Sequence, residues 1–437
     1  MQPYAQTQAA IEILAEAEEL ARPVDRVMSF YFRNNRYIGS KDKKAIAGQV
    51  YQTLRQQGLI DWALQQLELP TSARLRVAGQ LTLEGAHLDE IFNGERFAPR
   101  PLNAKEQAVQ SLAEKAQHAP TYAKLNYPAW AGELLLRAFD DQLYPAMEAL
   151  NKQAPTDIRL NMLKGDYEGL TLSLSDEGLE GEPTPLSASG IRVKNPGNLF
   201  GMEAFRDGLF EVQDAGSQVI AALCLAKPGL KVTDYCAGAG GKTLALAAAM
   251  ANKGVLTAGD IIEPKIGELK KRLRRAGVDN VQTQVWPLET KNTWIKRRKK
   301  TQDIVLLDVP CSGSGVWRRN PDAKWVLNPE RLEELCEIQQ SILQEASVLV
   351  KTGGRLVYAT CSVFQEENEA QIEHFLSQNK GFKIVPVAEV WAEALAAGSV
   401  HGICPTSAPM LRLAPHTTQT DGFFLTVLER TTDDDNS

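Results

Sequence analysis

Histidines and long apolar runs are both scarce in this sequence of 437 residues. It holds five histidines and six cysteines at irregular spacing, with no Cys-x-x-Cys pair. Such a set forms neither a disulfide framework nor a zinc site, so we expect reduced thiols and no metal. No apolar run approaches the roughly 20 residues of a membrane helix, and the start, Met1-Gln-Pro-Tyr-Ala-Gln, lacks a basic region followed by an apolar one. We therefore expect a cytoplasmic monomer with no membrane partner.

The sequence also lacks an overall excess of positive charge, since the net charge is −6. That value excludes a chain that is basic throughout, although local patches rather than net charge decide nucleic-acid binding. Positive charge gathers at 270–275, at 296–300 and at Arg318-Arg319. Each run alone could be a solvated surface, but together the three favour a phosphate-binding role.

The length suits two or three domains rather than one core. Residues 1–145 predict helices, since Ile46, Val50 and Leu54 recur at spacing four after a candidate N-cap at Ser40. Residues 146–214 carry prolines, glycines and short apolar stretches, which predict a small mixed α+β unit. The acidic end, 431–437, predicts a disordered tail.

From 215 to 430 the pattern is strand then helix, repeated. Apolar stretches predict strands at 230–235, 255–260, 281–285, 303–308 and 355–360, and a long helix at 329–350. Alternation of this kind predicts an α/β domain with a mainly parallel sheet that helices cover on both faces.

A glycine-rich loop follows the first of these strands and consists of Cys236, Ala237, Gly238, Ala239, Gly240, Gly241 and Lys242. Glycines let the backbone approach a ligand, and the amino terminus of the next helix favours negative charge. An NTPase loop is excluded, because it needs glycine where Cys236 stands. Asp260, which closes the second strand, could accept hydrogen bonds from both ribose hydroxyls of a nucleoside-containing cofactor. A purely structural tight turn is the alternative.

Two cysteines follow predicted strands directly: Cys311 in Asp308-Val-Pro-Cys-Ser-Gly and Cys361 in Tyr358-Ala-Thr-Cys-Ser. Open α/β sheets hold their ligands at the carboxyl ends of the strands, so both thiols should reach one substrate. Carbon 5 of a pyrimidine is a poor nucleophile, and methylating it requires a thiolate that adds to carbon 6. By contrast, Cys224 and Cys336 lie in helical patterns and predict small buried hydrophobic residues.

The motifs around these cysteines, at 308–325 and 353–368, and the closing Asp421-Gly-Phe-Phe resemble the Sun/Fmu family of RNA 5-methylcytosine methyltransferases. The first part is similar to that family's NusB-like RNA-binding domain through Lys41-Asp-Lys-Lys and Leu54-Arg. The resemblance implies a Rossmann-like methyltransferase domain at 215–430 that depends on S-adenosylmethionine. It also implies that the small α+β unit and an all-α NusB-like domain at 1–145 precede it.

The resemblance also implies roles for individual residues. The family's nucleophile falls on Cys361, and Cys311 then assists elimination of the enzyme, whereas in DNA 5-methylcytosine enzymes the Pro-Cys thiol attacks. Asp308, expected as a desolvated carboxyl group, would share a proton with the cytosine edge near nitrogen 3 and lie beside the cofactor. The loop from Cys236 to Lys242 would cradle the methionine part of the cofactor and Asp260 its ribose. Arg318 and Arg319 would hold phosphate while the target base is flipped out.

Two departures from the family pattern matter. Gly238-Ala239 stands where the family usually has Ala-Pro, a change that glycine tolerates. The acidic residue expected near the adenine is absent from Val285-Trp-Pro-Leu-Glu, so either Trp286 or Glu289 would serve and the contact stays unassigned. We expect a cytosine-5 RNA methyltransferase that acts on 16S ribosomal RNA. The alternatives are a transfer RNA methyltransferase with the same chemistry and a non-catalytic RNA-binding or ribosome-assembly factor on the same fold.

Overall fold

The structure, a computed structural model, describes residues 1–286 and 291–432. Its internal contacts divide the chain into two compact units. The helical unit comprises Met1–Gln153 with Trp317–Asn328, and the catalytic unit comprises Ala154–Val316 with Pro329–Ser437. The domain boundaries predicted after 145 and after 214 stay predictions, and the tail residues 433–437 lie outside the described residues.

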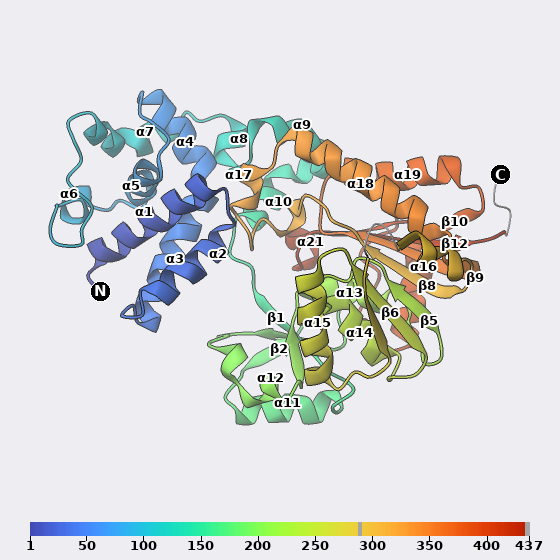
Figure 1. The fold of residues 1–437 in the computed structure, drawn as a ribbon. Helices are drawn as coiled ribbons and strands as arrows, with labels where there is room; N and C mark the ends of the chain where they lie inside the picture. Colours follow the sequence, from blue (N-terminus) through green and yellow to red (C-terminus); the bar gives the residue numbers. More distant parts are fainter. Residues whose placement is uncertain (287–290, 433–437) are drawn as a thin grey trace. The chain divides into compact units, whose positions relative to one another are not determined.

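The helical unit consists of short and medium helices (Figure 1), and buried side chains between Ala9 and Leu112 form an apolar core within it. Its helices are α1 (Pro3–Leu20), α2 (Val24–Asn34), α3 (Ser40–Arg55), α4 (Gln57–Gln66), α5 (Ala73–Leu83), α6 (Leu88–Ile91), α7 (Leu112–Ala116), α8 (Thr121–Lys124), α9 (Gly132–Phe139), α10 (Leu143–Leu150) and α17 (Ala323–Val326).

The spacing-four pattern of α3 is confirmed, because Ile46, Val50 and Leu54 are all buried in this core. Residues four apart lie on one face of a helix, so the three side chains form a single apolar stripe. The predicted cap is wrong, since α3 starts at Ser40 itself and its N-cap residue is Gly39, with no capping hydrogen bond from a side chain.

The segment 317–328 leaves the catalytic unit after β8 (Gln302–Asp308) and packs within the helical unit. Lys324 is fully buried and donates a hydrogen bond from Nζ to Asn151 Oδ1 at 2.6 Å. The indole N–H of Trp325 donates to the carbonyl of Leu54 at 2.9 Å. Burial lowers the pKa of Lys324 to about 7, because a charged ammonium group is less stable away from water.

A small antiparallel sheet opens the catalytic unit, with the strand order β2-β3-β1-β4. Its elements are β1 (Thr156–Leu160), α11 (Tyr167–Asp176), β2 (Gly181–Pro183), β3 (Gly190–Val193), α12 (Glu203–Arg206) and β4 (Phe210–Val212). Ile158, Leu160 and Phe210 are buried beneath α11 and α12 in a core of its own.

The large sheet of the catalytic unit has the order β10-β12-β9-β8-β5-β6-β7, with β11 paired to β12. Its elements are α13 (Ala215–Ala222), β5 (Lys231–Asp234), α14 (Gly241–Ala249), β6 (Val255–Asp260), α15 (Glu263–Ala276), β7 (Val281–Val285), α16 (Lys291–Arg297), β8 (Gln302–Asp308), α18 (Pro329–Ser347), β9 (Val350–Thr360), α19 (Glu369–Gln378), β10 (Phe382–Val385), α20 (Val387–Ala396), β11 (Leu411–Leu413), α21 (Pro415–Thr418) and β12 (Phe423–Arg430). Strands β5 to β9 pair in parallel, and β10, β11 and β12 pair antiparallel. All five predicted strands and the predicted long helix are present.

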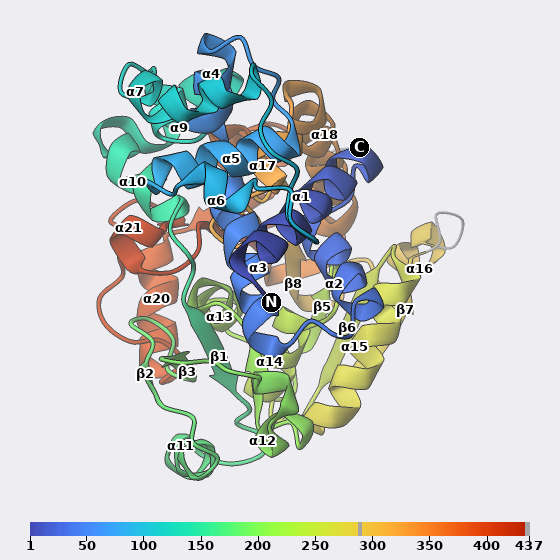
Figure 2. The same ribbon diagram turned by 90° about the vertical axis from the view of Figure 1, so that its left-hand side faces the viewer.

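Helices cover both faces of this sheet because successive strand residues point to opposite sides. Ile304 and Leu306 of β8 pack with α13, α14 and α20, whereas Val305 and Leu307 pack with α18 and α19. Figure 2 shows α15 lying along β6 and β7. The predicted Rossmann-like arrangement is thus confirmed, and it brings the carboxyl ends of β5, β6, β8 and β9 to one edge.

Candidate active site

One cavity of about 540 Å³ lies at the carboxyl ends of the parallel strands. Its lining includes the predicted residues Cys236, Ala237, Gly238, Ala239, Gly241, Lys242, Asp260, Asp308, Cys311 and Cys361. Gly240 is not part of the lining, because its α-carbon faces Leu269 of α15, where a Cβ would come within 2.2 Å of Leu269 Cδ1. Its positive φ of 89° serves the turn that starts α14.

The two predicted thiols meet in this cavity. Cys311 Sγ and Cys361 Sγ are 3.4 Å apart, and both side chains are half-buried. A hydrogen bond to Cys361 and burial together raise the pKa of Cys311 well above its ordinary value. The raised pKa favours the protonated form of Cys311.

A buried carboxylate joins the two cysteine loops, and the sequence analysis did not predict it. Glu367 Oε1 accepts hydrogen bonds from the backbone N–H of Ser312 at 2.7 Å and from Gln339 Nε2 at 3.0 Å. Its Oε2 accepts from the hydroxyls of Ser312 and Ser362. Each cysteine precedes one of these serines, so one fully buried side chain fixes both loops.

Close backbone packing brings the same loops together. Gly315 N–H donates to the carbonyl of Cys361 at 2.9 Å, and Gly422 N–H donates to the carbonyl of Gly315 at 2.8 Å. A Cβ on Gly422 would come within 2.6 Å of Gly315 Cα, and a Cβ on Gly315 within 2.2 Å of Gly422 O. The closing Asp421-Gly segment thus requires glycine because two backbones touch there.

Asp308 is not the desolvated carboxyl group that the sequence predicts. Its side chain is 32% exposed and pairs with Lys242, whose Nζ lies 2.7 Å from Asp308 Oδ2. Burial alone would lower the pKa of Lys242, but the charges of Asp308 and Cys361 outweigh it and raise that pKa. The pair therefore presents a proton donor and a carboxylate together beside the thiols.

The glycine loop is held by arginines from outside it. Arg159 of β1 is buried and donates from Nη1 to the carbonyl of Gly241 at 2.8 Å. Arg272 of α15 donates from Nη1 to the carbonyl of Ala239 at 2.8 Å. These bonds fix the loop backbone before any ligand arrives, so its shape is part of the fold.

The loop and β6 fit a nucleoside. Asp260 is buried and accepts hydrogen bonds from the N–H groups of Gly238 and Ile262, one on each oxygen, which leaves each oxygen further lone pairs. Ile261 and Ile262 line the same cavity and are 66% and 41% exposed, which places an apolar surface beside the Asp260 carboxylate. Sequence analysis missed both, although they directly follow Asp260.

The unassigned adenine contact falls partly outside what the structure describes. Trp286 lines the cavity but is buried, and its indole N–H donates to the carbonyl of Tyr235 at 2.9 Å. Glu289 lies outside the described residues. The exposed isoleucines therefore offer more apolar surface to an adenine than Trp286 does.

Two of the predicted basic runs are engaged within the protein. In the run 270–275, Arg272 and Arg275 both form ion pairs with the buried carboxylate of Glu211. Arg318 belongs to the helical unit and is only 6% exposed there. Its expected role in holding phosphate stays a prediction. Arg319 is half-buried in the same unit.

The other predicted cysteines lie away from the cavity. Cys224 is fully buried, and Cys336 is half-buried with Sγ 3.5 Å from the carbonyl of Glu366. Residues 1–286 and 291–432 contain no group of three side chains that could hold a metal ion. Across the same residues, no helix has the length and apolar character needed to cross a membrane.

Comparisons with known proteins agree with this geometry. A family model described as 16S rRNA methyltransferase RsmB/F matches residues 222–429, and one described as a Methyltr_RsmF/B-like, ferredoxin-like domain matches residues 127–199. A protein of Synechocystis sp. named probable ribosomal RNA small subunit methyltransferase B is 30% identical over 370 residues, which cover 83% of this chain and 79% of that one. The crystal structure of PH0851 has a TM-score of 0.77 at 27% identity, covering 98% of this chain and 99% of that one. A methyltransferase homologue from Pyrococcus horikoshii has a TM-score of 0.59 at 26% identity, covering 71% and 97%.

Proposed function

The chain belongs to the 16S rRNA methyltransferase RsmB/F family, and from that membership we propose that it methylates carbon 5 of a cytosine in 16S ribosomal RNA. Family membership makes it an RNA methyltransferase, and it implies S-adenosylmethionine as the methyl donor. The base, the atom and the RNA are our proposal.

The observation that carries the proposal is the 3.4 Å contact between Cys311 and Cys361 within the cavity that Asp260 and the glycine loop also line. Methyl transfer to an amine or a hydroxyl group needs no thiol, whereas transfer to carbon 5 of a pyrimidine needs a thiolate nucleophile. Two thiols in one cofactor-sized cavity therefore favour the carbon-5 reaction.

We assign the addition step to Cys361. Its thiolate forms a bond to carbon 6 of cytosine, and the π electrons of the carbon 5–carbon 6 bond shift onto carbon 5, which becomes nucleophilic. Carbon 5 would then take the methyl group while the methyl–sulfur bond of the donor breaks and its electrons stay on that sulfur. Asp308 and Lys242 lie at the same edge of the cavity and share the proton that nitrogen 3 takes up as the adduct forms. At this step the raised pKa of Cys311 favours its protonated form, which supports Cys361 rather than Cys311 as the proposed nucleophile.

Elimination restores the ring after the methyl group has arrived. In this step Cys311 first gives its own proton to solvent and then takes the proton from carbon 5, while nitrogen 3 returns its proton to the Asp308–Lys242 pair. The carbon 6–sulfur bond then breaks, its electrons return to Cys361, and the double bond forms again. The distance of 3.4 Å between the sulfurs supports this role, because Cys311 lies next to the departing group.

The cavity fits the methyl donor that the family uses. S-adenosylmethionine supplies an electrophilic methyl group on sulfur. Asp260 would hold its ribose, Ile261 and Ile262 would pack on its adenine, and the loop from Cys236 to Lys242 would hold its methionine part. On the RNA side, Arg319 stays the candidate for a phosphate contact while the cytosine is flipped out.

The test is methyl transfer with identified product. The purified chain, given S-adenosylmethionine with a radiolabelled methyl group, should label unmethylated 16S ribosomal RNA and yield 5-methylcytidine on nucleoside analysis. Unmethylated transfer RNA serves as the second substrate, because the transfer RNA alternative uses the same chemistry.

A matched cysteine variant controls for loss of any thiol. Cys404→Ala, outside the cavity, should keep the wild-type rate. A labelled product other than 5-methylcytidine would refute the reaction, labelling of transfer RNA alone would refute the substrate, and no labelling of any RNA would favour a non-catalytic factor.

A further inference from the structure

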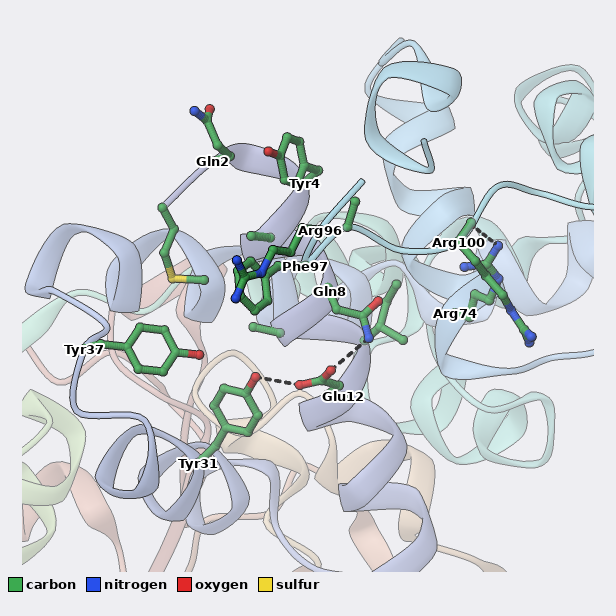
Figure 3. Close-up of a pocket in the computed structure, with 15 residues that line it drawn as sticks. Gln2, Tyr4, Gln8, Glu12, Tyr31, Tyr37, Arg74, Arg96, Phe97 and Arg100 are labelled. Carbon is green, nitrogen blue, oxygen red and sulfur yellow. Dashed lines mark hydrogen bonds between the residues drawn. The ribbon is translucent and has the colours of Figure 1, made fainter. Parts of the chain in front are cut away.

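A second cavity, of about 990 Å³, lies within the helical unit (Figure 3). It is bounded by α1, α2, the start of α5 and the loops that precede α3 and follow α6. The lining is rich in two residue types, aromatic and arginine. They are Tyr4, Tyr31, Tyr37, Phe97, Arg74, Arg96 and Arg100.

Two of the rings are unusually open to solvent. Tyr37 is 74% exposed and Phe97 is 67% exposed, although both are large side chains that normally gain by burial. Phe97 also has a φ of 72°, a left-handed conformation that is strained for a bulky residue. Residues in strained backbone conformations cluster at active sites and at the clamps that hold ligands.

The arginines have two different roles. Arg74 donates from Nη2 to the carbonyls of Arg100 and Pro101 and forms an ion pair with Glu106, so it builds the loop. Arg96 lies over the Phe97 ring, with its guanidinium carbon 4.8 Å from the ring centroid. Within the described residues, neither Arg96 nor Arg100 has an ion pair with a carboxylate.

The cavity holds one acidic side chain, and it is engaged on both oxygens. Glu12 accepts a hydrogen bond from Tyr31 Oη at 2.6 Å and one from Gln8 Nε2 at 2.8 Å, as Figure 3 shows. Glu106 forms an ion pair with Arg74 and also interacts electrostatically with Arg100. Among the lining residues, Arg96 and Arg100 then stand against one carboxylate, that of Glu12. An anionic ligand therefore matches the charge of the cavity better than a cationic or neutral one.

We propose that this cavity binds an unpaired segment of the RNA substrate, with bases stacked on Phe97 and Tyr37 and the backbone phosphate held by Arg96 and Arg100. Open aromatic faces beside arginines are the arrangement that binds single-stranded nucleic acid, since every base offers a flat face. An acidic peptide matches the charge but leaves the ring faces unused, and a duplex hides its base faces. The inference rests on the proposed RNA substrate and adds a second recognition site to it.

The experiment measures fluorescence anisotropy of a fluorescein-labelled single-stranded RNA of mixed sequence, about 12 nucleotides long, with the full chain. Phe97→Ala and Tyr37→Ala should each weaken binding about 5- to 100-fold, since a stacked base contributes about 1–3 kcal/mol. Arg96→Ala should lower the slope of log affinity against log salt by about 1. The matched controls are Tyr144→Ala, a 55% exposed tyrosine of α10 outside the cavity, and Lys115→Ala on α7. Both should bind within about twofold of the wild type.

The comparison probes are the same RNA annealed into a duplex and a polyaspartate peptide as competitor. Weaker binding of the duplex and no competition by the peptide support the proposal. A 4-thiouridine substitution in the single strand should photocrosslink to a peptide that contains Tyr37 or Phe97, which tests contact without any substitution in the protein.

The proposal is overturned if the Phe97 and Tyr37 variants keep wild-type affinity, if the peptide competes as well as RNA, or if the crosslink maps elsewhere. These failures are separate from failure of the proposed function. If the wild-type chain methylates RNA and the Phe97→Ala variant binds RNA with normal affinity, only the proposed RNA-binding cavity is refuted. If the wild-type chain binds RNA but methylates none, and the Phe97→Ala variant loses that binding, only the methyltransferase proposal is refuted.

Discussion

Glu367 shows how much of this site depends on a residue that does not line the cavity. It is fully buried, and every hydrogen bond to its carboxylate comes from a donor that sits on or beside a cysteine loop or on α18. A buried carboxylate is stable only when such donors surround it. The same donors then fix where Cys311 and Cys361 lie.

Replacing Glu367 with glutamine should therefore shift the positions of Cys311 and Cys361 rather than weaken the binding of S-adenosylmethionine. An amide nitrogen would face a donor in place of one oxygen, so the two loops would separate. We expect Glu367→Gln to lower kcat by about 10- to 100-fold, the range that small misplacements of reacting groups produce, with little change in the KM for S-adenosylmethionine. Steady-state kinetics would measure both constants.

Glu373→Gln, an exposed position on α19, is the matched control and should leave both constants unchanged. Wild-type kcat in the Glu367 variant would show that the buried carboxylate does not position the thiols.

Asp234, at the end of β5, gives the protein a pH-dependent stability. Its Oδ2 accepts a hydrogen bond from the Thr243 hydroxyl at 2.6 Å, while its buried Oδ1 has no partner within the described residues. Burial raises its pKa from 3.8 to about 7. Because the folded state binds this proton more tightly than the unfolded state, the stabilisation is complete below pH 4 and is lost as the pH rises to about 7.

Asp234→Asn removes that titration. The free energy of unfolding of the variant, relative to the wild type, should rise between pH 4 and pH 7, as urea unfolding at several pH values would measure. Asp279→Asn, an exposed aspartate, should show no such trend. A flat difference for Asp234→Asn would mean that this carboxyl group titrates normally.

At the scale of elements, the site depends on β12 reaching the cysteine loops. Gly422 immediately precedes β12, and its backbone contacts that of Gly315 in the loop after Cys311. A Cβ on Gly422 would meet backbone atoms of Gly315 and, at 3.0 Å, the Cγ1 atom of the short side chain of Val363, so relief would require the backbone to shift. The start of β12 and the loop after Cys311 are therefore coupled through Gly422 and Gly315.

Gly422→Ala should destabilise the protein by about 1–3 kcal/mol, the cost of overpacking, and reduce methyl transfer. Thermal unfolding and the methyl-transfer assay would measure the two effects. Gly267→Ala in α15 is the matched control, because a Cβ there meets no atom within 4 Å. In a helix interior that change should stabilise by about 0.5–1 kcal/mol. Equal stability of the Gly422 variant and the wild type would contradict the coupling.

Elements with a local signal were predictable, and those defined by distant partners were not. The strand at 255–260 begins with the apolar pair Val255 and Leu256, and the structure has it at the predicted bounds. The segment 317–328 has no such signal, because its place depends on contacts such as that of Trp325 with Leu54, far away in the sequence. The ion pairs of Arg272 and Arg275 in the basic run 270–275 were unpredictable for the same reason, since their partner Glu211 lies on another element.

For the molecule as a whole, the sequence predicted the family and the strand ends that carry Asp260, Asp308, Cys311 and Cys361, because each follows a strand of a parallel sheet. It could not predict what lies between them. The ion pair of Lys242 with Asp308 and the hydrogen bonds of Glu367 to the two cysteine loops depend on three-dimensional packing. The predicted roles of the two cysteines stay predictions, although the raised pKa of Cys311 supports them.

The most direct measurement is the covalent protein–RNA complex that survives denaturing electrophoresis after incubation with S-adenosylmethionine and unmethylated 16S ribosomal RNA. Cys311→Ala should accumulate this complex, because addition and methylation proceed but elimination is slow. Cys361→Ala should form no complex and transfer no methyl group. Normal methylation by Cys361→Ala, or a complex that forms without Cys361, would contradict the account.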